Sequence, residues 1–400
     1  MDDATLRAWW FHRQGLDGWL SGTSPAEVLK RTGWARSVAG SGPYLSFFSR
    51  AGSSREAVDA AIANREIHEL PSARGCTYVL PADDFALGLR VGEEFSRGDM
   101  AVAKKLGVTD KEIVELRSAV LGVLDKGPLT TEEIREATGK AARNLGAEGA
   151  KKGMTTTLPL ALGGLQASGQ IRRIPLNGRL DQQRYRYAIW EPNPLSTYRI
   201  SAAGSYSELA SRYFRWIGPA TLSEFRWFSG LGAKTARAAI AALGLVPAEA
   251  GSDRMMSTDG RELFHRFKVP PKPAYALLSS LDSLFLLRRN LAALLTAAAA
   301  KRKVWVERGA RELGSLSDLN SNAIVDRGAI IGLWEYDPEQ GAIAWFTFEP
   351  ADRKLRETVV RTEAFIREQL GDARSFSLDS PRSRAPRIAA IRDAGKRQPA

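Results

Sequence analysis

Residues 151–190 read KKGMTTTLPLALGGLQASGQIRRIPLNGRLDQQRYRYAIW, and this stretch joins a helical pattern to a hairpin pattern. Three leucines of its first half lie at helical spacing: Leu158, Leu162 and Leu165. They predict a helix over 154–168, with Pro159 in its first turn because a deeper proline would remove a hydrogen bond. Arginines then alternate with Ile or Tyr on both sides of Asn177-Gly178, which predicts a β-hairpin. A helix followed by such a hairpin is typical of a winged helix.

The residues before this stretch predict the other helices of the same unit. Apolar side chains recur at helical spacing over 110–124, which predicts a first helix. Thr130 and Glu133 have the spacing of a capping box, which predicts a short helix over 132–138. The helix that begins after the two lysines is then expected to be the recognition helix.

The positive charge of the chain is concentrated in two segments. Residues 140–190 carry nine Lys or Arg against two acidic residues, and residues 374–400 carry seven against two. Together these excesses equal the net charge of +12. A basic stripe on one motif predicts a phosphate-binding face, and a solvated hairpin of a protein-interaction module is the alternative. The predicted DNA-binding residues lie before the recognition helix or on the hairpin: Lys151, Lys152, Thr155, Arg172, Arg173, Arg179, Arg184 and Arg186.

A second helix-turn-helix pattern follows over 207–243, with strands expected between 255 and 267. The C-terminal third predicts four short strands and then a helix: 303–306, 323–325, 329–336, 342–348 and 354–370. The expected fold is therefore α+β, with tandem winged-helix units and a C-terminal strand-rich α+β region. The expected divisions are 1–105 (a winged-helix-like unit), 106–192, 200–275, 276–375 and a basic, disordered tail over 376–400.

Composition excludes several classes of protein. A single cysteine, Cys76, excludes an internal disulfide framework, and three scattered histidines do not give the ligand spacing of a zinc site. No glycine-rich phosphate loop with a following Lys-Ser/Thr is present. The chain has no apolar run of about 18 residues. We expect a cytoplasmic, nucleoid-associated protein without a metal or a cofactor.

Several short segments resemble one family in the same order along the chain. They are Arg13-Gln14-Gly15-Leu16, GPYLSFFSR (42–50), ARGCTYVLPADDF (73–85), DKGP (125–128) and Leu281-Asp282-Ser283. Together they resemble the AlkZ/YcaQ-type DNA glycosylases, which unhook interstrand crosslinks. The resemblance implies tandem winged helices that bind duplex DNA, with alkylated or crosslinked DNA as the expected substrate, and a glycosylase site in the N-terminal unit.

The sequence departs from this family at the catalytic motif, which is a Gln, an apolar residue, and then Gln or Asp. The matching positions here are Arg36 and Val38. Cleavage of an N-glycosidic bond builds positive charge on the sugar, so it needs an acceptor that orients water. Arginine is a permanent cation and valine forms no hydrogen bond. The sequence predicts either an altered glycosylase or a winged-helix DNA binder or regulator that lost the chemistry.

Other residues near this motif have two interpretations each. A carboxylate at another position could replace the missing acceptor in catalysis. The candidates that lie nearby in the chain are Glu66, Glu69, Asp83 and Asp84. Three tryptophans could stack on an exposed base, although a place in the core is the favoured interpretation: Trp9, Trp10 and Trp34. Arg288 and Arg289 could contact phosphate or lie on a solvated helix face.

Overall fold

Three successive units of the chain share one order of elements in the computed structural model, which describes residues 2–182, 184–306 and 309–396. In each unit a helix precedes a short extended segment, two helices and a pair of strands. The first unit contains α2 (Pro25–Thr32), β1 (Ala35–Arg36), α3 (Gly42–Ala51), α4 (Arg55–Ala63), β2 (Ile67–Pro71) and β3 (Thr77–Pro81). Its antiparallel sheet has the order β1-β3-β2.

The second unit repeats this order in the basic part of the chain, with one additional short helix, α9 (Gly146–Lys151), between the other two. Its elements are α7 (Asp110–Leu124), β4 (Leu129–Thr130), α8 (Thr131–Thr138), α9, α10 (Leu158–Ala167), β5 (Ile171–Pro175) and β6 (Tyr185–Ile189), and the sheet order is β4-β6-β5. The expected capping box is present, because Thr130 accepts from the Glu133 backbone and Glu133 accepts from the Thr130 backbone. Pro159 lies in the first turn of α10, as its missing N–H requires.

The third unit differs from the sequence expectation after its first strands. It contains α11 (Ala202–Ile217), α12 (Leu222–Ser229), α13 (Ala233–Ala241), β7 (Val246–Pro247) and β8 (Met255–Met256), and Ala220 bridges to Met255 in the place of a first strand. Of the strands expected between 255 and 267, the structure contains Met255–Met256; the expectation is wrong for the rest, because Ser257 caps a helix, α14 (Thr258–Arg266). Phe264 is the buried residue of that helix and packs against Trp9.

A four-stranded antiparallel sheet forms the C-terminal region. Its strands are β9 (Tyr275–Leu278), β12 (Asn322–Asp326), β13 (Ala329–Asp337) and β14 (Ala342–Thr347), in the order β14-β13-β12-β9. The hairpin of β10 (Lys303–Val306) and β11 (Gly309–Glu312) is a separate two-stranded sheet. One face of the four-stranded sheet packs on α3 and on α17 (Arg353–Phe365). Helix α17 continues as a π-helical turn over Ile366–Leu370.

The expectation of a disordered tail is wrong for most of its length. Residues 381–396 form α18 (Pro381–Lys396), and Ile388 and Ile391 pack in a core with the sheet residue Leu333. The tail was expected to be disordered because it is rich in Ser, Pro and Arg, but a face of the sheet buries its apolar side chains. Residues 397–400 lie outside the described residues.

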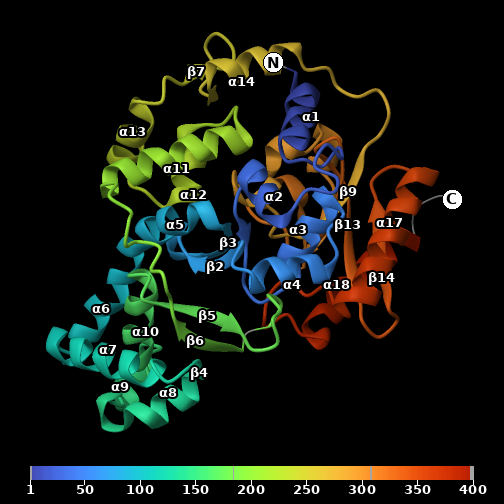
Figure 1. The fold of residues 1–400 in the computed structure, drawn as a ribbon. Helices are drawn as coiled ribbons and strands as arrows, with labels where there is room; N and C mark the ends of the chain where they lie inside the picture. The colour runs from blue at the N-terminus through green and yellow to red at the C-terminus, as the bar shows by residue number, and fades with distance from the viewer. Residues whose placement is uncertain (1, 183, 307–308, 397–400) are drawn as a thin grey trace.

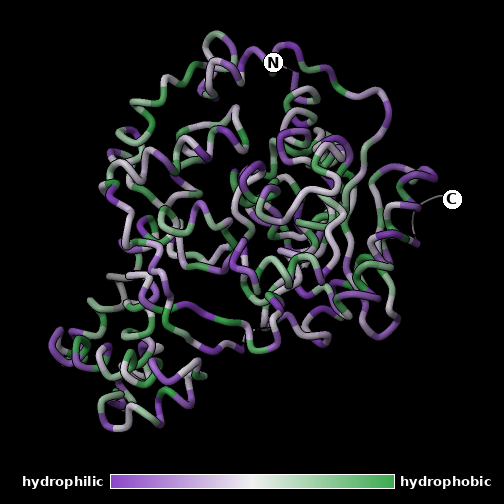
Figure 2. The backbone as a smooth tube through the Cα atoms, viewed as in Figure 1, coloured by the Kyte–Doolittle hydropathy of each residue, from purple (hydrophilic) through white to green (hydrophobic). Residues whose placement is uncertain are grey.

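The first helix, α1 (Asp3–Arg13), packs in the same core as α18 rather than with its neighbours in sequence. Figure 1 shows this helix, in dark blue, beside the orange and red C-terminal region. In the same view the second unit projects at the lower left, and its hairpin of β5 and β6 points back towards α4. Figure 2 shows hydrophilic residues along the outer edges of the molecule, for example on α17. The second unit contacts the rest of the protein through its hairpin and through α10, which packs on α5 (Phe85–Gly92). Helix α6 (Arg97–Lys104) lies between α5 and this unit in the chain.

Candidate functional site

The segment that carries Arg36 and Val38 runs from the edge strand β1 into the loop before α3. Arg36 pairs with Tyr78 of β3, and the Ser37 amide continues the ladder to the Thr77 carbonyl. Because side chains alternate along a strand, Arg36 shares a face with Tyr78 while Ser37 lies on the opposite face. The segment therefore presents two chemically different surfaces.

Arg36 lies on an aromatic surface and not beside a carboxylate. Its Nη1 donates to the Thr77 carbonyl at 2.7 Å, and its guanidinium carbon is 5.5 Å from the centre of the Tyr78 ring. Within the described part of the chain, Arg36 forms no ion pair. Val38 is half-buried and offers its carbonyl to the Ser377 amide at 3.2 Å. At these two positions the structure therefore contains a cation and an apolar side chain, without an acceptor side chain.

The opposite face of the segment contacts a buried carboxylate, that of Glu69 on β2. The Ser37 hydroxyl, which is 1% exposed, donates to Glu69 Oε1. Glu69 Oε2 is buried and accepts no hydrogen bond from the described residues. Burial, and then the charge of Glu69, raise the pKa of the Tyr185 hydroxyl on the hairpin. Glu69 thus links the motif segment to β6.

The other three candidate carboxylates have different partners. Asp84 accepts from the Trp34 indole at 2.8 Å and from Arg212 at 2.7 Å. Asp83 pairs with Lys30 at the surface, and Glu66 is exposed beside Asn64. Of the four, Glu69 is the one that contacts the residues between positions 36 and 38.

A stack of two arginines and a tryptophan is related to Arg36 through the buried Tyr78, because the charges of Arg36 and Arg74 both oppose the rise that burial causes in the Tyr78 pKa. The guanidinium carbons of Arg74 and Arg289 lie 3.3 Å and 3.6 Å from the centre of the Trp227 ring. Arg74 precedes β3 and Trp227 belongs to α12, while Arg289 follows α15 (Ser283–Leu286). We call Arg36, Tyr78, Arg74, Trp227 and Arg289 the arginine–aromatic band.

The backbone holds both outer arginines of this stack in the left-handed region. The φ angles are 59° at Arg74 and 50° at Arg289, where a side chain other than glycine costs energy. Arg289 also pairs with Asp318 at 2.6 Å. Strain of this kind collects where the surrounding structure fixes a functional group, so the band is a candidate ligand surface. Sequence reasoning missed Arg74 and Trp227, although ARGCTYVL was one of the segments that carried the resemblance.

The structure separates the predicted DNA-binding residues into two groups. Five of them are exposed: Lys151, Lys152, Thr155, Arg184 and Arg186. Lys151 is paired with Glu148 at 2.7 Å on the surface. The other three are engaged within the protein: Arg172, Arg173 and Arg179.

Each of these three arginines has a distinct environment. Burial lowers the pKa of Arg172, and Arg173 lies over the Tyr185 ring with its Nε buried. Arg179 pairs with Asp181 and donates to the Leu370 carbonyl at 3.1 Å. Arg179 thus joins the hairpin to the C-terminal region, and Arg184 and Arg186 are exposed cations of the hairpin.

Three of the segments that resemble the family converge on one buried ion pair. Arg50 donates to both oxygens of Asp282 at 2.8 Å, and its Nη2 also donates to Gln14 at 3.0 Å. Ser46 donates to the same carboxylate at 2.6 Å. Burial alone would raise the pKa of Asp282, but the Arg50 charge and these hydrogen bonds hold it below its usual range. The network fixes α3, which follows the motif loop.

The three tryptophans considered for base stacking are all buried, as the favoured interpretation expects: Trp9, Trp10 and Trp34. Arg288 is buried too, with its guanidinium 3.5 Å from the centre of the Trp10 ring, so the interpretation of Arg288 as a phosphate contact is wrong. The described residues contain no cluster of three or more side chains that could hold a metal ion. None of the described helices combines the length and the apolar character needed to cross a membrane.

Two comparisons with known proteins found similar proteins. A family model described as DNA glycosylase AlkZ-like matches residues 37–376. Among solved structures, the Streptomyces sahachiroi DNA glycosylase AlkZ is similar, with a TM-score of 0.67 and 20% sequence identity, over 93% of this chain and 98% of that chain. No curated protein matches the sequence.

Proposed function

Because this chain belongs to the AlkZ-like DNA glycosylase family, we propose that it binds duplex DNA with damaged purines and acts in DNA repair. The observation that carries the proposal is the arginine–aromatic band beside the family's motif positions. A guanidinium that stacks on a ring can still direct its N–H edge at a phosphate oxygen. Arg74 has this arrangement over Trp227, whereas Arg289 already pairs with Asp318. A protein that acts on chromosomal DNA would work in the cytoplasm at the nucleoid.

The repeated order of elements supports a tandem winged-helix scaffold as part of this proposal. Helix, short strand, two helices and a hairpin, with the first strand paired to the last, is the order expected of a winged helix. In the second unit, the end of α9, the loop before α10 and the exposed hairpin arginines would contact the backbone of the duplex: Lys151, Lys152, Thr155, Arg184 and Arg186. Alkylated or crosslinked purines are the proposed lesions.

The residues at the motif positions favour binding over rapid hydrolysis. Departure of a purine leaves an oxocarbenium-like sugar, and a nearby guanidinium opposes that charge. Loss of one such electrostatic contact changes rates by about a hundredfold to a thousandfold. We therefore propose that this protein recognises damage and cleaves the glycosidic bond slowly.

One observation favours a second candidate function, which is base excision that depends on Glu69. This buried carboxylate has an oxygen without a partner of ordinary geometry and contacts the motif segment through Ser37. A buried carboxylate can serve as a general base when a small movement brings water to it. The near-complete burial of Ser37 is the obstacle, since water has no direct access to the carboxylate from that side.

Single-turnover base release from duplex DNA with an N7-alkylguanine tests both candidates. The wild-type protein should bind this duplex and release the base only slightly faster than spontaneous depurination without protein. The Arg36→Gln/Val38→Gln variant should bind more weakly, because it loses one arginine of the band, and it should gain measurable release, because it restores acceptors at both positions. Rapid release by the wild-type protein that Glu69→Gln abolishes would reject slow cleavage and establish the second candidate. Absence of duplex binding at low salt would reject the proposed function itself.

A further inference from the structure

An exposed apolar turn lies directly beside the motif loop. Among the described residues, eight large hydrophobic side chains are exposed, and two of them are Phe376 (43% exposed) and Leu378 (82% exposed). They are two positions apart in the turn that leads into α18. Isolated exposed leucines are ordinary on protein surfaces, but these two side chains belong to a turn that is held in place and contacts the motif loop.

The turn is joined to the motif loop by backbone contacts. The Ser377 amide donates to the Val38 carbonyl at 3.2 Å, and the Ser41 amide donates to the Arg374 carbonyl at 2.9 Å. A Cβ on Gly40 would lie only 2.2 Å from the Ser375 carbonyl oxygen. The two segments therefore pack backbone against backbone, and Phe376 and Leu378 project next to the motif positions.

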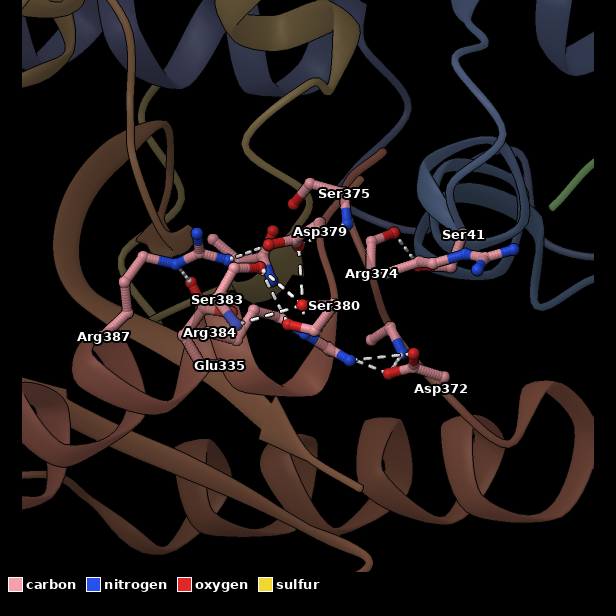
Figure 3. Close-up of polar contacts among 12 residues, drawn as sticks. Ser41, Glu335, Asp372, Arg374, Ser375, Asp379, Ser380, Ser383, Arg384 and Arg387 are labelled. Carbon is pink, nitrogen blue, oxygen red and sulfur yellow. Dashed lines mark hydrogen bonds and ion pairs between the residues drawn. The ribbon is translucent and has the colours of Figure 1, made fainter. Parts of the chain in front are cut away.

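Charged residues at the start of α18 hold the turn in place. Asp379 accepts from the Ser375 amide at 3.0 Å and from Arg387 at 2.8 Å. Arg387 also reaches the buried Glu335 of β13 at 2.9 Å, and burial raises the pKa of that carboxyl while Arg387 opposes the rise. Figure 3 shows this network around Asp379, with the contact of Ser41 and Arg374 beside it. These hydrogen bonds and ion pairs fix the turn, while the side chains of Phe376 and Leu378 remain exposed.

The charge around the turn favours a polyanion as its partner. Arg374 and Arg382 stand on either side of it in the chain, and Arg382 is exposed. The one carboxylate inside the turn, that of Asp379, is already paired with Arg387. Two side chains are also too small an apolar patch for a stable protein interface.

We infer that Phe376 and Leu378 form a wedge that inserts between base pairs of the bound duplex, next to the nucleotide that faces Arg36. The inference rests on the proposed function. Proteins that kink or open DNA insert apolar side chains between base steps, and the resulting unstacking costs a few kcal/mol per step. A rigidly anchored turn can repay this cost because it loses little conformational entropy on binding.

The test uses the full-length protein and a short duplex with a tetrahydrofuran abasic site flanked by the fluorescent base 2-aminopurine. At saturating wild-type protein, the 2-aminopurine fluorescence should rise several-fold because the base loses stacking. The Phe376→Ser/Leu378→Ser variant should lose at least half of this rise and bind about tenfold more weakly. The Leu378→Phe variant should retain the rise, and Val360→Ser, which removes another exposed apolar side chain, should match the wild-type protein.

The outcomes separate this inference from the proposed function. An equal rise for the wild-type protein and the double serine variant, with both duplexes saturated, would overturn the wedge while leaving DNA binding intact. Failure of the wild-type protein to bind the duplex would overturn the proposed function and the wedge with it. Equal thermal unfolding temperatures of the variants would establish that the loss is not one of folding, as expected for side chains this exposed.

Discussion

Arg50 illustrates how single residues in this chain join segments that are far apart in sequence. Its side chain is buried, and it satisfies Asp282 and Gln14 at once. A buried pair of this kind adds little net stability over an apolar pair, but the loss of one partner leaves an uncompensated charge.

Substitution of Arg50 should therefore destabilise the protein strongly. Arg50→Met should lower the free energy of unfolding by about 3–5 kcal/mol because Asp282 remains buried without a cation. Denaturation by urea measures this change. The double variant Arg50→Met/Asp282→Leu is the control and should recover much of the loss; an Arg50→Met protein as stable as the wild type would contradict the expectation.

His68 gives a pH-dependent prediction at the same scale. Burial, and then the nearby Arg172, Arg173 and Arg65, lower the pKa of its imidazole to about 3 in the folded protein, against 6.5 for an unperturbed histidine. Between these values the unfolded chain binds a proton that the folded chain does not. The titration of His68 therefore does not change the free energy of unfolding above pH 6.5, and below pH 6.5 it lowers this free energy by about 1.4 kcal/mol for each pH unit.

The variant His68→Phe isolates this effect, because its ring can still pack near Trp190 and Phe85. As the pH falls from 7 to 5, the wild-type protein should lose more unfolding free energy than this variant. A difference that stays constant over this range would show that the imidazole is not held neutral.

At the scale of elements, the loop before α3 and the turn before α18 depend on each other. Gly40→Ala should lower the free energy of unfolding by about 1–3 kcal/mol, because its Cβ would overlap the Ser375 backbone, which cannot rotate away. Gly163→Ala in α10 is the matched control, since nothing lies within 4 Å of its Cβ, and it should stabilise the helix slightly. Thermal unfolding measures both, and a silent Gly40→Ala would mean that the two segments separate easily.

The hairpin of β5 and β6 is the element for which charge makes a direct prediction. Arg184→Glu/Arg186→Glu should weaken duplex binding, and the slope of log affinity against log salt should fall by about two if each arginine contacts one phosphate. Fluorescence anisotropy over a salt series measures both quantities. Retained affinity and slope would exclude the hairpin as a phosphate contact and favour its role in protein interaction.

At the scale of the whole molecule, Trp227 of the arginine–aromatic band and the exposed hairpin arginines belong to different units, and within the described residues they have no partner in common. If one duplex contacts both, the losses in binding free energy from Trp227→Ala and from Arg184→Glu/Arg186→Glu should add within about 0.5 kcal/mol in the combined variant. Anisotropy titrations at one salt concentration test this sum. A combined variant no weaker than either parent would mean that the surfaces do not bind the same duplex.

The sequence by itself determined the local elements, because their signals are local. Helical spacing of apolar residues predicted α7 and α10, and the Thr130–Glu133 capping box predicted the start of α8. The ordered segments of the family resemblance also pointed to the family that the comparison established. At the motif, the sequence showed the substitution to Arg36 and Val38, since residue identity alone decides it.

Only the tertiary structure decided which distant side chains meet. Helix α18 contains an internal proline, Pro386, and its sequence predicts disorder. The helix forms because the sheet buries one of its faces, and because Arg387 pairs with Glu335 of the sheet and with Asp379 of the preceding turn. The stack of Arg74, Trp227 and Arg289 joins three parts of the chain through left-handed backbone at both arginines. Such contacts depend on packing between segments far apart in sequence, which no local pattern records.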